Sequence, residues 1–591
     1  MKHKRHIQIF NHTLLLGISI GLTAAMPVHS QSNEQQLRNP NQLRLPARSP
    51  KHEQEQSPKK PGQQTAARFP HDIRTINGAE NNLQHQDWGQ ADIEFIRLAP
   101  AAYTDGSSTL AGSQRPSARL ISNIVVATDP AATIDGPPLS DMVWQWGQFL
   151  DHDIDLTPEV EPSESAPITV PAGDQWFDPG VTGTQTIALH RSLYNTVDDI
   201  REQLNLITAY IDASNVYGSD AERATALRTN DGTGKLLSSD GNLLPFNTSG
   251  LPNAPSNADS FFIAGDFRAN EQVGLTSMHT LFMREHNRIA EQVKGNNPIL
   301  SGENVYQTAR ALVGAQIQAI TYREFLPVLL GNDALPPYRG YKPTTNAGIS
   351  NEFATAAYRF GHTMVSPQIL RLNSSNQEIG SGHLSLDQAF FSPDELIFNG
   401  IDPLLRGLSN QRAQKVDSFL VDALRNLLFG PPGAGGLDLA ALNIQRGRDH
   451  GLSSYNETRK ALGLPKAQSF ADITPDQQHQ HALESAYDSV DSVDLWVGGL
   501  AEPAAHRGII GNTFRTILID QFTRLRDGDR FWYETYLPQE QRDWVNQQSL
   551  AKIIRRNTSI SDEISDHVFV LSDPDNQPTP PRQTNRRPRK R

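Results

Sequence analysis

The stretch Trp144-Gln-Trp-Gly-Gln-Phe-Leu-Asp-His-Asp-Ile-Asp-Leu-Thr-Pro158 sets carboxylates and one histidine among large apolar side chains. As a helix, it carries four polar residues on one face, namely Gln148, Asp151, His152 and Asp155. Burying such groups costs free energy unless they are paired, covalently bonded or set against a metal. The stretch therefore predicts a functional helix, with a polar helix surface as the alternative. Asp153 points away from the His152 face, toward a different site.

Length and composition narrow the class of protein. The chain has 591 residues, enough for a large core, and its net charge of −12 disfavours a nucleic-acid partner. It contains no cysteine, which excludes thiolate catalysis, disulfides and iron–sulfur clusters. After the first residues, no stretch is long and apolar enough to predict a membrane span.

Both ends of the chain have biased compositions. Residues 1–30 read as a signal peptide, with cleavage near Ser30 or after Ala25, so we expect a secreted or periplasmic protein. Residues 31–70 are rich in Gln, Pro and Lys, which predicts a disordered linker or pro-segment. The basic residues 573–591 predict a disordered tail that is solvated or touches an anionic surface. The sequence does not indicate an oligomeric state.

Between these ends, residues 71–572 read as one mainly α domain with very little β. Apolar residues recur at helical spacing over 276–294, 305–325 and 351–364, whereas alternating strand patterns are scarce.

Four further segments carry candidate site residues. Thr208, Asp212 and Ser214 alternate along a loop with the carbonyl of Tyr210, and Asp153 can add a carboxylate, as Ca²⁺ sites require. A polar turn is the alternative. Arg268 and Glu271 stand just before a helix, where a loop can direct them into a pocket. His279 and His286 on that helix lack zinc-motif spacing and read as structural.

The last two segments carry His362 and the pair Asn443 and Arg446. His362 follows a glycine in an apolar, aromatic helix, which indicates close approach of a flat group or a satisfied core histidine. In Leu442–Leu452, Asn443 can fix a histidine tautomer, and Arg446 can neutralise a ligand carboxylate. A charged helix start is the alternative.

Together the motifs resemble the animal-type haem peroxidases of the peroxidase–cyclooxygenase superfamily, with peroxidasin-like and bacterial members most similar. The resemblance includes "NNLQHQDWG", "RPSARLISN", "WGQFLDHDIDLTPE", "YIDASNVYGS", "AGDFRANE", "NAGISNEFATAAYRFGHT" and "LNIQRGRDHGL" in this order. It implies a mainly α fold in which haem b lies between a distal and a proximal helix.

The resemblance also implies a role for each matching residue. On the distal side, His152 matches the acid–base histidine, Arg268 the charge-stabilising arginine and Gln148 the glutamine that orders a water or halide. On the proximal side, His362 matches the iron ligand and Asn443 its partner. The remaining matches are Arg359 and Arg446 near the haem propionates, Asp151 and Glu271 as ester links to haem methyls, and Asp153, Thr208, Tyr210, Asp212 and Ser214 as the Ca²⁺ set.

The implied chemistry is reduction of H₂O₂ to water through an oxoferryl haem, which then oxidises small anions such as halides or thiocyanate, or phenols. Where the chloride-oxidising family member has a methionine after the ester-forming glutamate, this chain has Gln272. Iodide and bromide are therefore expected to be better substrates than chloride. The alternatives are a fatty-acid dioxygenase or cyclooxygenase of the same superfamily, and an inactive secreted adhesion scaffold. Cyclooxygenases place a radical tyrosine three residues before the proximal histidine, where this chain has Arg359, with Tyr358 four residues before.

Overall fold

The computed structural model describes residues 72–128 and 138–571. The expected signal peptide, linker and basic tail lie outside these residues. The central helix, α2 (Met142–Ile154), places Trp146, Phe149 and Leu150 in the core with no exposed surface. It ends where Asp155 adopts an extended conformation, with φ −144° and ψ 146°. Pro158 follows three residues later, and a proline disfavours helix at the residue before it.

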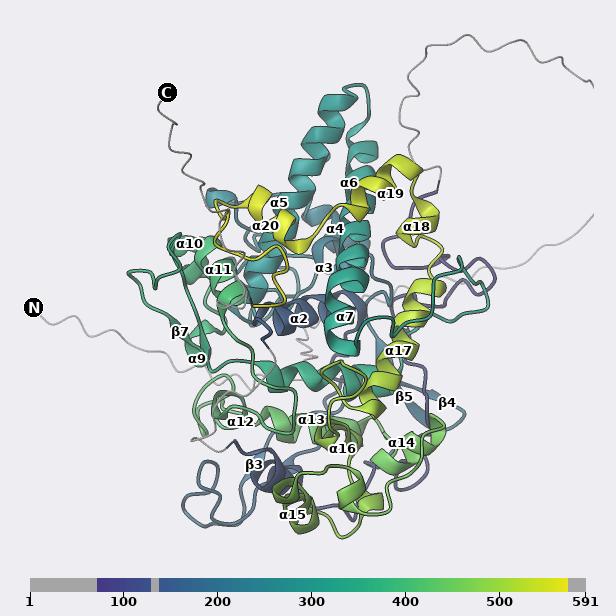
Figure 1. Ribbon diagram of the computed structural model, residues 1–591, viewed down its shortest axis with the longest axis vertical. Helices are drawn as coiled ribbons and strands as arrows, with labels where there is room; N and C mark the ends of the chain where they lie inside the picture. The colour runs from purple at the N-terminus through teal and green to yellow at the C-terminus, as the bar shows by residue number, and fades with distance from the viewer. Residues whose placement is uncertain (1–71, 129–137, 572–591) are drawn as a thin grey trace, which may run out of the picture.

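Two long helices, α5 (Val273–Asn296) and α6 (Gly302–Ile320), pack side by side above α2 (Figure 1). Aromatic side chains join α2 to α5: the Phe282 ring centroid lies 5.0 Å from that of Phe149 and 5.8 Å from that of Trp146. Because aromatic pairs bury large apolar areas in fixed geometry, they hold α2 rigidly against this helix pair.

Three elements lie below α2 in Figure 1: α13 (Leu439–Asp449), α16 (Leu495–Ala501) and the segment that carries His362. That segment consists of α8 (Asn351–Thr355), a break at Ala356, and the 3₁₀-helix η4 (Ala357–Met364). The helix η4 contacts α2, α16 and α17 (Asn512–Asp527). The sequence predicted helix here, but the α-helix breaks at Ala356, six residues before His362, and continues as a tighter 3₁₀-helix.

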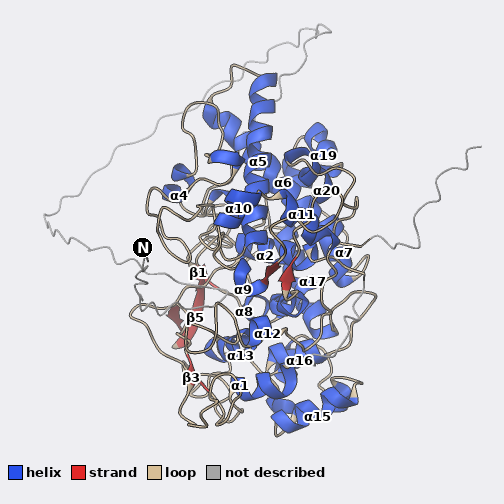
Figure 2. Cartoon of the chain, turned by 90° about the vertical axis from the view of Figure 1, so that its left-hand side faces the viewer, coloured by secondary structure: helices blue, strands red, loops and turns tan. Residues whose placement is uncertain are grey.

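The sheets are small and antiparallel (Figure 2). In one sheet, β5 (Ile200–Asn205) lies between β1 (Ile93–Glu94) and β4 (Tyr194–Val197). Its register pairs Ile93 with Asn205 and Tyr194 with Gln203. The two-stranded sheets are β2 (Ile168–Thr169) with β3 (Thr186–Ile187) and β6 (Gln368–Ile369) with β7 (Leu384–Ser385).

Short helices cover the remaining core. They are α1 (Ala118–Ile121), α3 (Ser214–Tyr217), α4 (Ala221–Ala226), α7 (Leu326–Leu330), α9 (Leu386–Ala389), α10 (Asp394–Asn399), α11 (Asp402–Asn410), α12 (Asp422–Arg425), α14 (Tyr455–Ala461), α15 (Gln477–Ala486), α18 (Tyr533–Tyr536), α19 (Gln539–Asn546) and α20 (Leu550–Asn557). The short 3₁₀ and π segments are η1 (Ser122–Val126), η2 (Asp240–Asn242), η3 (Thr321–Phe325), η5 (Phe470–Asp472) and η6 (Val490–Ser492).

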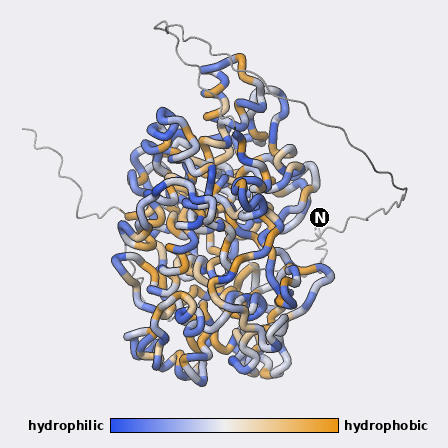
Figure 3. The backbone as a smooth tube through the Cα atoms, turned by 90° about the vertical axis from the view of Figure 1, so that its right-hand side faces the viewer, coloured by the Kyte–Doolittle hydropathy of each residue, from blue (hydrophilic) through white to orange (hydrophobic). Residues whose placement is uncertain are grey.

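The predicted mainly α fold with little β is confirmed. Polar and apolar stretches alternate along the backbone, as amphipathic helices around a shared core require (Figure 3). Over the described ranges, no helix combines the length and hydropathy needed to cross a bilayer.

Candidate active site

A cavity opens between α2 and η4. Most of its wall is apolar, with Trp144, Leu386 and Phe429 among the lining side chains. The polar lining comes from both sides and consists of Gln148, Asp151, Glu271, Gln272, Arg359 and His362. A mostly apolar space with one imidazole and several carboxyl groups on its walls suits a flat apolar group with a metal centre.

His362 provides the imidazole of the lower wall. Burial and the nearby Arg359 guanidinium lower the pKa of His362 to about 3, so it is neutral and can donate a lone pair to a metal. Its Nδ1 lies 2.8 Å from Asn443 Nδ2, and Arg359 Nη1 donates to Asn443 Oδ1 at 3.2 Å. For Nε2 to bind a metal, Nδ1 must carry the proton. Asn443 must then present its amide oxygen to Nδ1, which a rotation of the amide provides.

His152 lies on α2 with no exposed surface, and neither of its ring nitrogens has a hydrogen-bond partner within the described chain. Its Nδ1 is 3.5 Å from Asp266 Oδ1. Arg268, which is also fully buried, forms a two-point ion pair with Asp266, with Nε–Oδ1 2.9 Å and Nη2–Oδ2 2.8 Å. Neither His152 nor Arg268 is among the residues that line the cavity. The structure therefore pairs these two residues through Asp266.

A chain of amides orders the cavity wall nearest α5. Gln272 Nε2 donates to Gln145 Oε1 at 2.6 Å and to Gln148 Oε1 at 3.0 Å. Gln148 in turn donates through Nε2 to Glu271 Oε1 at 3.1 Å. Since each acceptor oxygen is fixed by the preceding donor, the amide of Gln148 is held in one orientation.

Asp151, which is half-buried, and Glu271, which is buried, are the carboxyls on this wall. Burial raises the pKa of Glu271 to about 7, against the opposing effect of the Arg268 guanidinium. Burial likewise raises the pKa of Asp151, which shares a hydrogen bond with Asp155. Asp155 was predicted on the helix, but it lies just beyond the last turn of α2 and reaches Asp151 from the extended chain.

The predicted calcium residues come together at the far side of α2. Ser214 Oγ donates to Asp153 Oδ1 at 2.9 Å, and Thr208 Oγ1 donates to Asp212 Oδ1 at 3.1 Å. Burial, together with the charge of Asp212, raises the pKa of Asp153, and Asp212 Oδ2 has no hydrogen-bond partner among the described residues. Two desolvated carboxylates and an orphaned oxygen fit a hard cation. The described residues gather no group of three or more His, Asp or Glu that could hold a metal, so a cation bound here would need hydroxyl and carbonyl oxygens as its other ligands.

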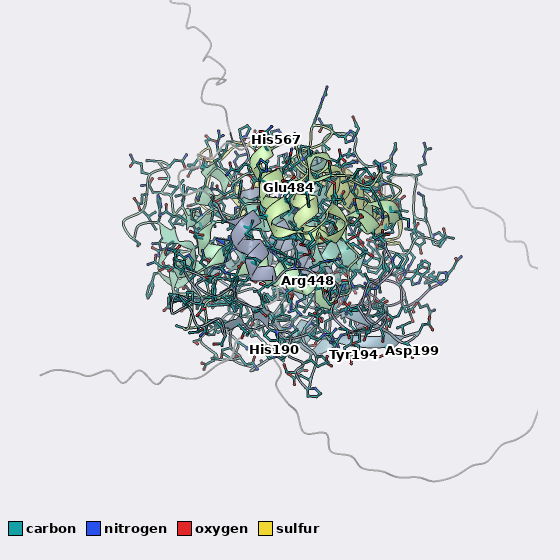
Figure 4. The ribbon with its side chains drawn as sticks, turned by 90° about the horizontal axis from the view of Figure 1, so that it is seen from below. His190, Tyr194, Asp199, Arg448, Glu484 and His567 are labelled. Carbon is teal, nitrogen blue, oxygen red and sulfur yellow. The ribbon has the colours of Figure 1, made fainter. Side chains whose placement is uncertain are left out.

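Arg446 does not line the cavity. Its Nη1 donates to the His190 carbonyl at 2.7 Å and pairs with Asp449 Oδ2 at 3.1 Å. Arg448, two positions after Arg446, forms its ion pair with a different carboxylate, that of Asp494, with Nη2–Oδ2 2.8 Å. His190 and Arg448 are labelled in Figure 4.

Comparison with known proteins decides the family. The family model "Animal haem peroxidase" matches residues 73–569. This chain belongs to the animal haem peroxidases. It is 39% identical over 562 residues to Peroxidasin of Drosophila melanogaster, covering 84% of this chain and 36% of that protein. It therefore spans little more than a third of that relative's length.

Two further relatives of this haem peroxidase match over nearly their whole length. Peroxinectin A of Dictyostelium discoideum is 39% identical over 521 residues, covering 84% of this chain and 96% of that protein. The structure of Peroxidase A from Dictyostelium discoideum superposes with a TM-score of 0.78 at 37% identity, covering 85% of this chain and all (100%) of that one. The haem peroxidase fold and enzyme class predicted from the motifs are confirmed.

Sequence reasoning missed several polar residues that shape the site of this peroxidase. Asp266 stands two positions before Arg268 within the quoted motif, so its spacing was available as a signal. Gln145 lies one turn before Gln148 on α2 and accepts a hydrogen bond from Gln272. Its contact joins α2 to the start of α5, which local sequence does not indicate.

Proposed function

We propose that this haem peroxidase reduces H₂O₂ with electrons from small anions, namely iodide, thiocyanate and bromide more than chloride, or from phenols. The observation that carries the proposal is that one cavity has neutral His362 on one wall and the fixed amide of Gln148 on the opposite wall. Haem, when bound, supplies the redox-active iron. Secretion, expected from residues 1–30, remains part of the proposal.

On the proximal wall, His362 would hold the iron through Nε2, with its proton on Nδ1 held by Asn443. A neutral amide leaves the imidazole less anionic than a carboxylate partner would, which keeps the potential of the bound metal comparatively high. Arg359 would face a propionate, because its guanidinium lines the same cavity. We retain Arg446 as a second propionate partner, although its contacts in the structure are with Asp449 and His190.

On the distal side, His152 would take a proton from one peroxide oxygen and return it to the other. Burial and the Arg268 charge lower the pKa of His152 well below its ordinary value, which keeps it ready to accept that proton. Arg268 would stabilise the negative charge that develops as the O–O bond breaks. Gln148 would order the water or halide, since its amide is fixed by Gln272.

The decisive experiment is the absorption spectrum of the purified protein before and after H₂O₂. A Soret band that shifts on addition of peroxide is expected, followed by its return when iodide or a phenol is supplied. A protein that binds haem and ignores peroxide would contradict the proposal. Steady-state turnover with iodide, bromide, thiocyanate, chloride and phenols would then rank the donors.

Removing calcium is expected to destabilise the protein and disturb the haem spectrum together, because Asp153 adjoins His152 on α2. A ligand present at one hundred times its Kd contributes about 2.7 kcal/mol, so dialysis against EDTA should lower Tm by several degrees. Asp212→Asn should do the same, whereas the isosteric Asp199→Asn at an exposed turn should not (Figure 4). If elemental analysis finds no calcium, this cluster is only a turn.

Peroxide treatment is expected to leave haem attached to the protein through Asp151 and Glu271. Both are carboxyl groups on the wall of the same cavity, where each can reach the edge of a flat ligand. Haem should then resist extraction by acid–acetone. The double variant Asp151→Asn, Glu271→Gln keeps the side-chain shapes and should release haem cleanly. Clean extraction from the unaltered protein would refute the ester links.

Chloride is expected to be oxidised at least about tenfold more slowly than bromide at pH 7. Gln272 cannot form the sulfonium link described for the chloride-oxidising family member, and its amide is engaged with Gln145 and Gln148. Chlorination and bromination of a trapping amine, measured side by side, provide the test. Gln272→Met should raise chlorination, while Gln272→Leu controls for loss of the amide. Equal rates for the two halides in the unaltered protein would show that Gln272 does not set the limit.

A further inference from the structure

Asp266 occupies a buried position between the two distal residues His152 and Arg268. The preceding Gly265 lets the loop approach α3 closely, since a Cβ there would lie 2.3 Å from the Ser214 carbonyl oxygen. Asp266 N then donates to the Asn215 carbonyl at 3.1 Å. This anchor directs the Asp266 side chain, 3% exposed as a residue, into the space beside α2.

The contacts of the Asp266 carboxylate keep it ionised. Its Oδ1 accepts from the backbone N–H of Arg268 at 2.8 Å and from Arg268 Nε at 2.9 Å, and its Oδ2 accepts from Nη2 at 2.8 Å. These contacts offset burial and hold the pKa of Asp266 well below its ordinary value. An ionised carboxylate has no proton to donate, so a ring nitrogen that faces it must carry the hydrogen.

The ring nitrogen that faces Asp266 is His152 Nδ1, 3.5 Å from Oδ1. That distance is just beyond a hydrogen bond, and such contacts in ligand-free sites commonly shorten when the reacting molecule binds. No other hydrogen-bond partner of either His152 nitrogen exists in the described ranges. A proton on Nδ1 leaves the lone pair on Nε2, the tautomer that a general base requires.

We propose that Asp266 is a positioning residue that holds the Nδ1–H tautomer of His152 and, through the same carboxylate, fixes Arg268 relative to that imidazole. The Asp266 side chain thus contacts both the imidazole of His152 and the guanidinium of Arg268 and holds them at a constant distance from each other. The inference rests on the proposed distal roles of His152 and Arg268. It assigns to Asp266 no contact with peroxide.

Asp155 does not duplicate this arrangement. Its backbone carbonyl accepts from Arg268 Nη2 at 3.0 Å, and its side chain shares a hydrogen bond with Asp151. Asp174 forms a comparable buried two-point pair with Arg119, with Nε–Oδ2 2.7 Å and Nη2–Oδ1 3.0 Å, and neither residue lines the cavity. Asp174→Asn is therefore the matched control, because it replaces the carboxylate of a buried arginine pair with an amide and leaves the Asp266 contacts in place.

The test compares Asp266→Asn, Asp266→Glu and the control Asp174→Asn in the haem-loaded enzyme. The first readout is the exchangeable Nδ1 proton of His152, observed by proton NMR in the cyanide-ligated form. The second is the rate of cyanide binding, which needs a base for HCN, and the third is the rate of reaction with H₂O₂. Asp266→Asn should accelerate exchange of the Nδ1 proton and slow both reactions by about tenfold or more. Asp266→Glu keeps a carboxylate, so its proton exchange and both of its rates should lie between those of Asp266→Asn and those of the unaltered protein.

The outcomes separate this inference from the proposed function. If the unaltered protein reacts with peroxide but Asp266→Asn keeps the proton exchange and both rates within twofold, the inference is overturned. An equal loss in Asp174→Asn would also overturn it, because the effect would then be nonspecific. If Asp266→Asn does not load haem, Asp266→Ser takes its place: proton exchange and both rates within twofold of the unaltered protein contradict the inference, and faster exchange with slower rates supports it. An unaltered protein that ignores peroxide defeats the proposed function instead.

Discussion

His362→Ala is expected to abolish stable haem binding, with loss of the Soret band and of all peroxidase activity. His362 is the imidazole on the cavity wall, and burial keeps it neutral and ready to bind iron. Arg359, three positions earlier on η4 and also on the cavity wall, is cationic and cannot replace it. Haem content per protein, measured as the pyridine haemochrome, provides the reading.

The matched control is His567→Ala, which removes an exposed histidine far along the chain (Figure 4). It should leave haem content unchanged. Added imidazole should partly restore the Soret band of His362→Ala, because the truncation leaves room for a free imidazole beside Asn443. A fully loaded, active His362→Ala enzyme would show that the iron ligand lies elsewhere.

The helical framework follows from patterns that are local in sequence. Phe149 and His152 are three positions apart in α2, and Met278 and Phe282 are four apart in α5, so the existence of both helices is predictable from periodicity. The contacts among Thr208, Asp212 and Ser214 are predictable for a similar reason, because these residues lie within seven positions of one another. The contact of Ser214 with Asp153 is one long-range pairing, which the need for an outside carboxylate beside this loop had suggested.

Other features depend on contacts between distant segments. The break at Ala356 arises where η4 packs against α2 and α16, and periodicity over 351–364 does not reveal it. The orientation of Gln148 depends on Gln272, which is more than one hundred residues away. Arg446 Nη1 donates to the carbonyl of His190, which lies 256 positions away in the sequence. Such pairings are decided by tertiary packing, which the sequence pattern does not specify.

His152→Ala is expected to retain haem and to slow the reaction with H₂O₂ by about 10²-fold or more, which corresponds to about 2.7 kcal/mol. The imidazole is buried beside Arg268 and Asp266, so its loss removes the proton acceptor but leaves the charged pair intact. Stopped-flow measurement of the Soret change gives the rate. His279→Gln is the control, because it changes another buried histidine, one whose ring packs against Phe149 and that has no assigned part in proton transfer. Its rate of reaction with H₂O₂ should stay within about threefold of that of the unaltered enzyme. An unchanged rate in His152→Ala would rule out proton transfer by this residue.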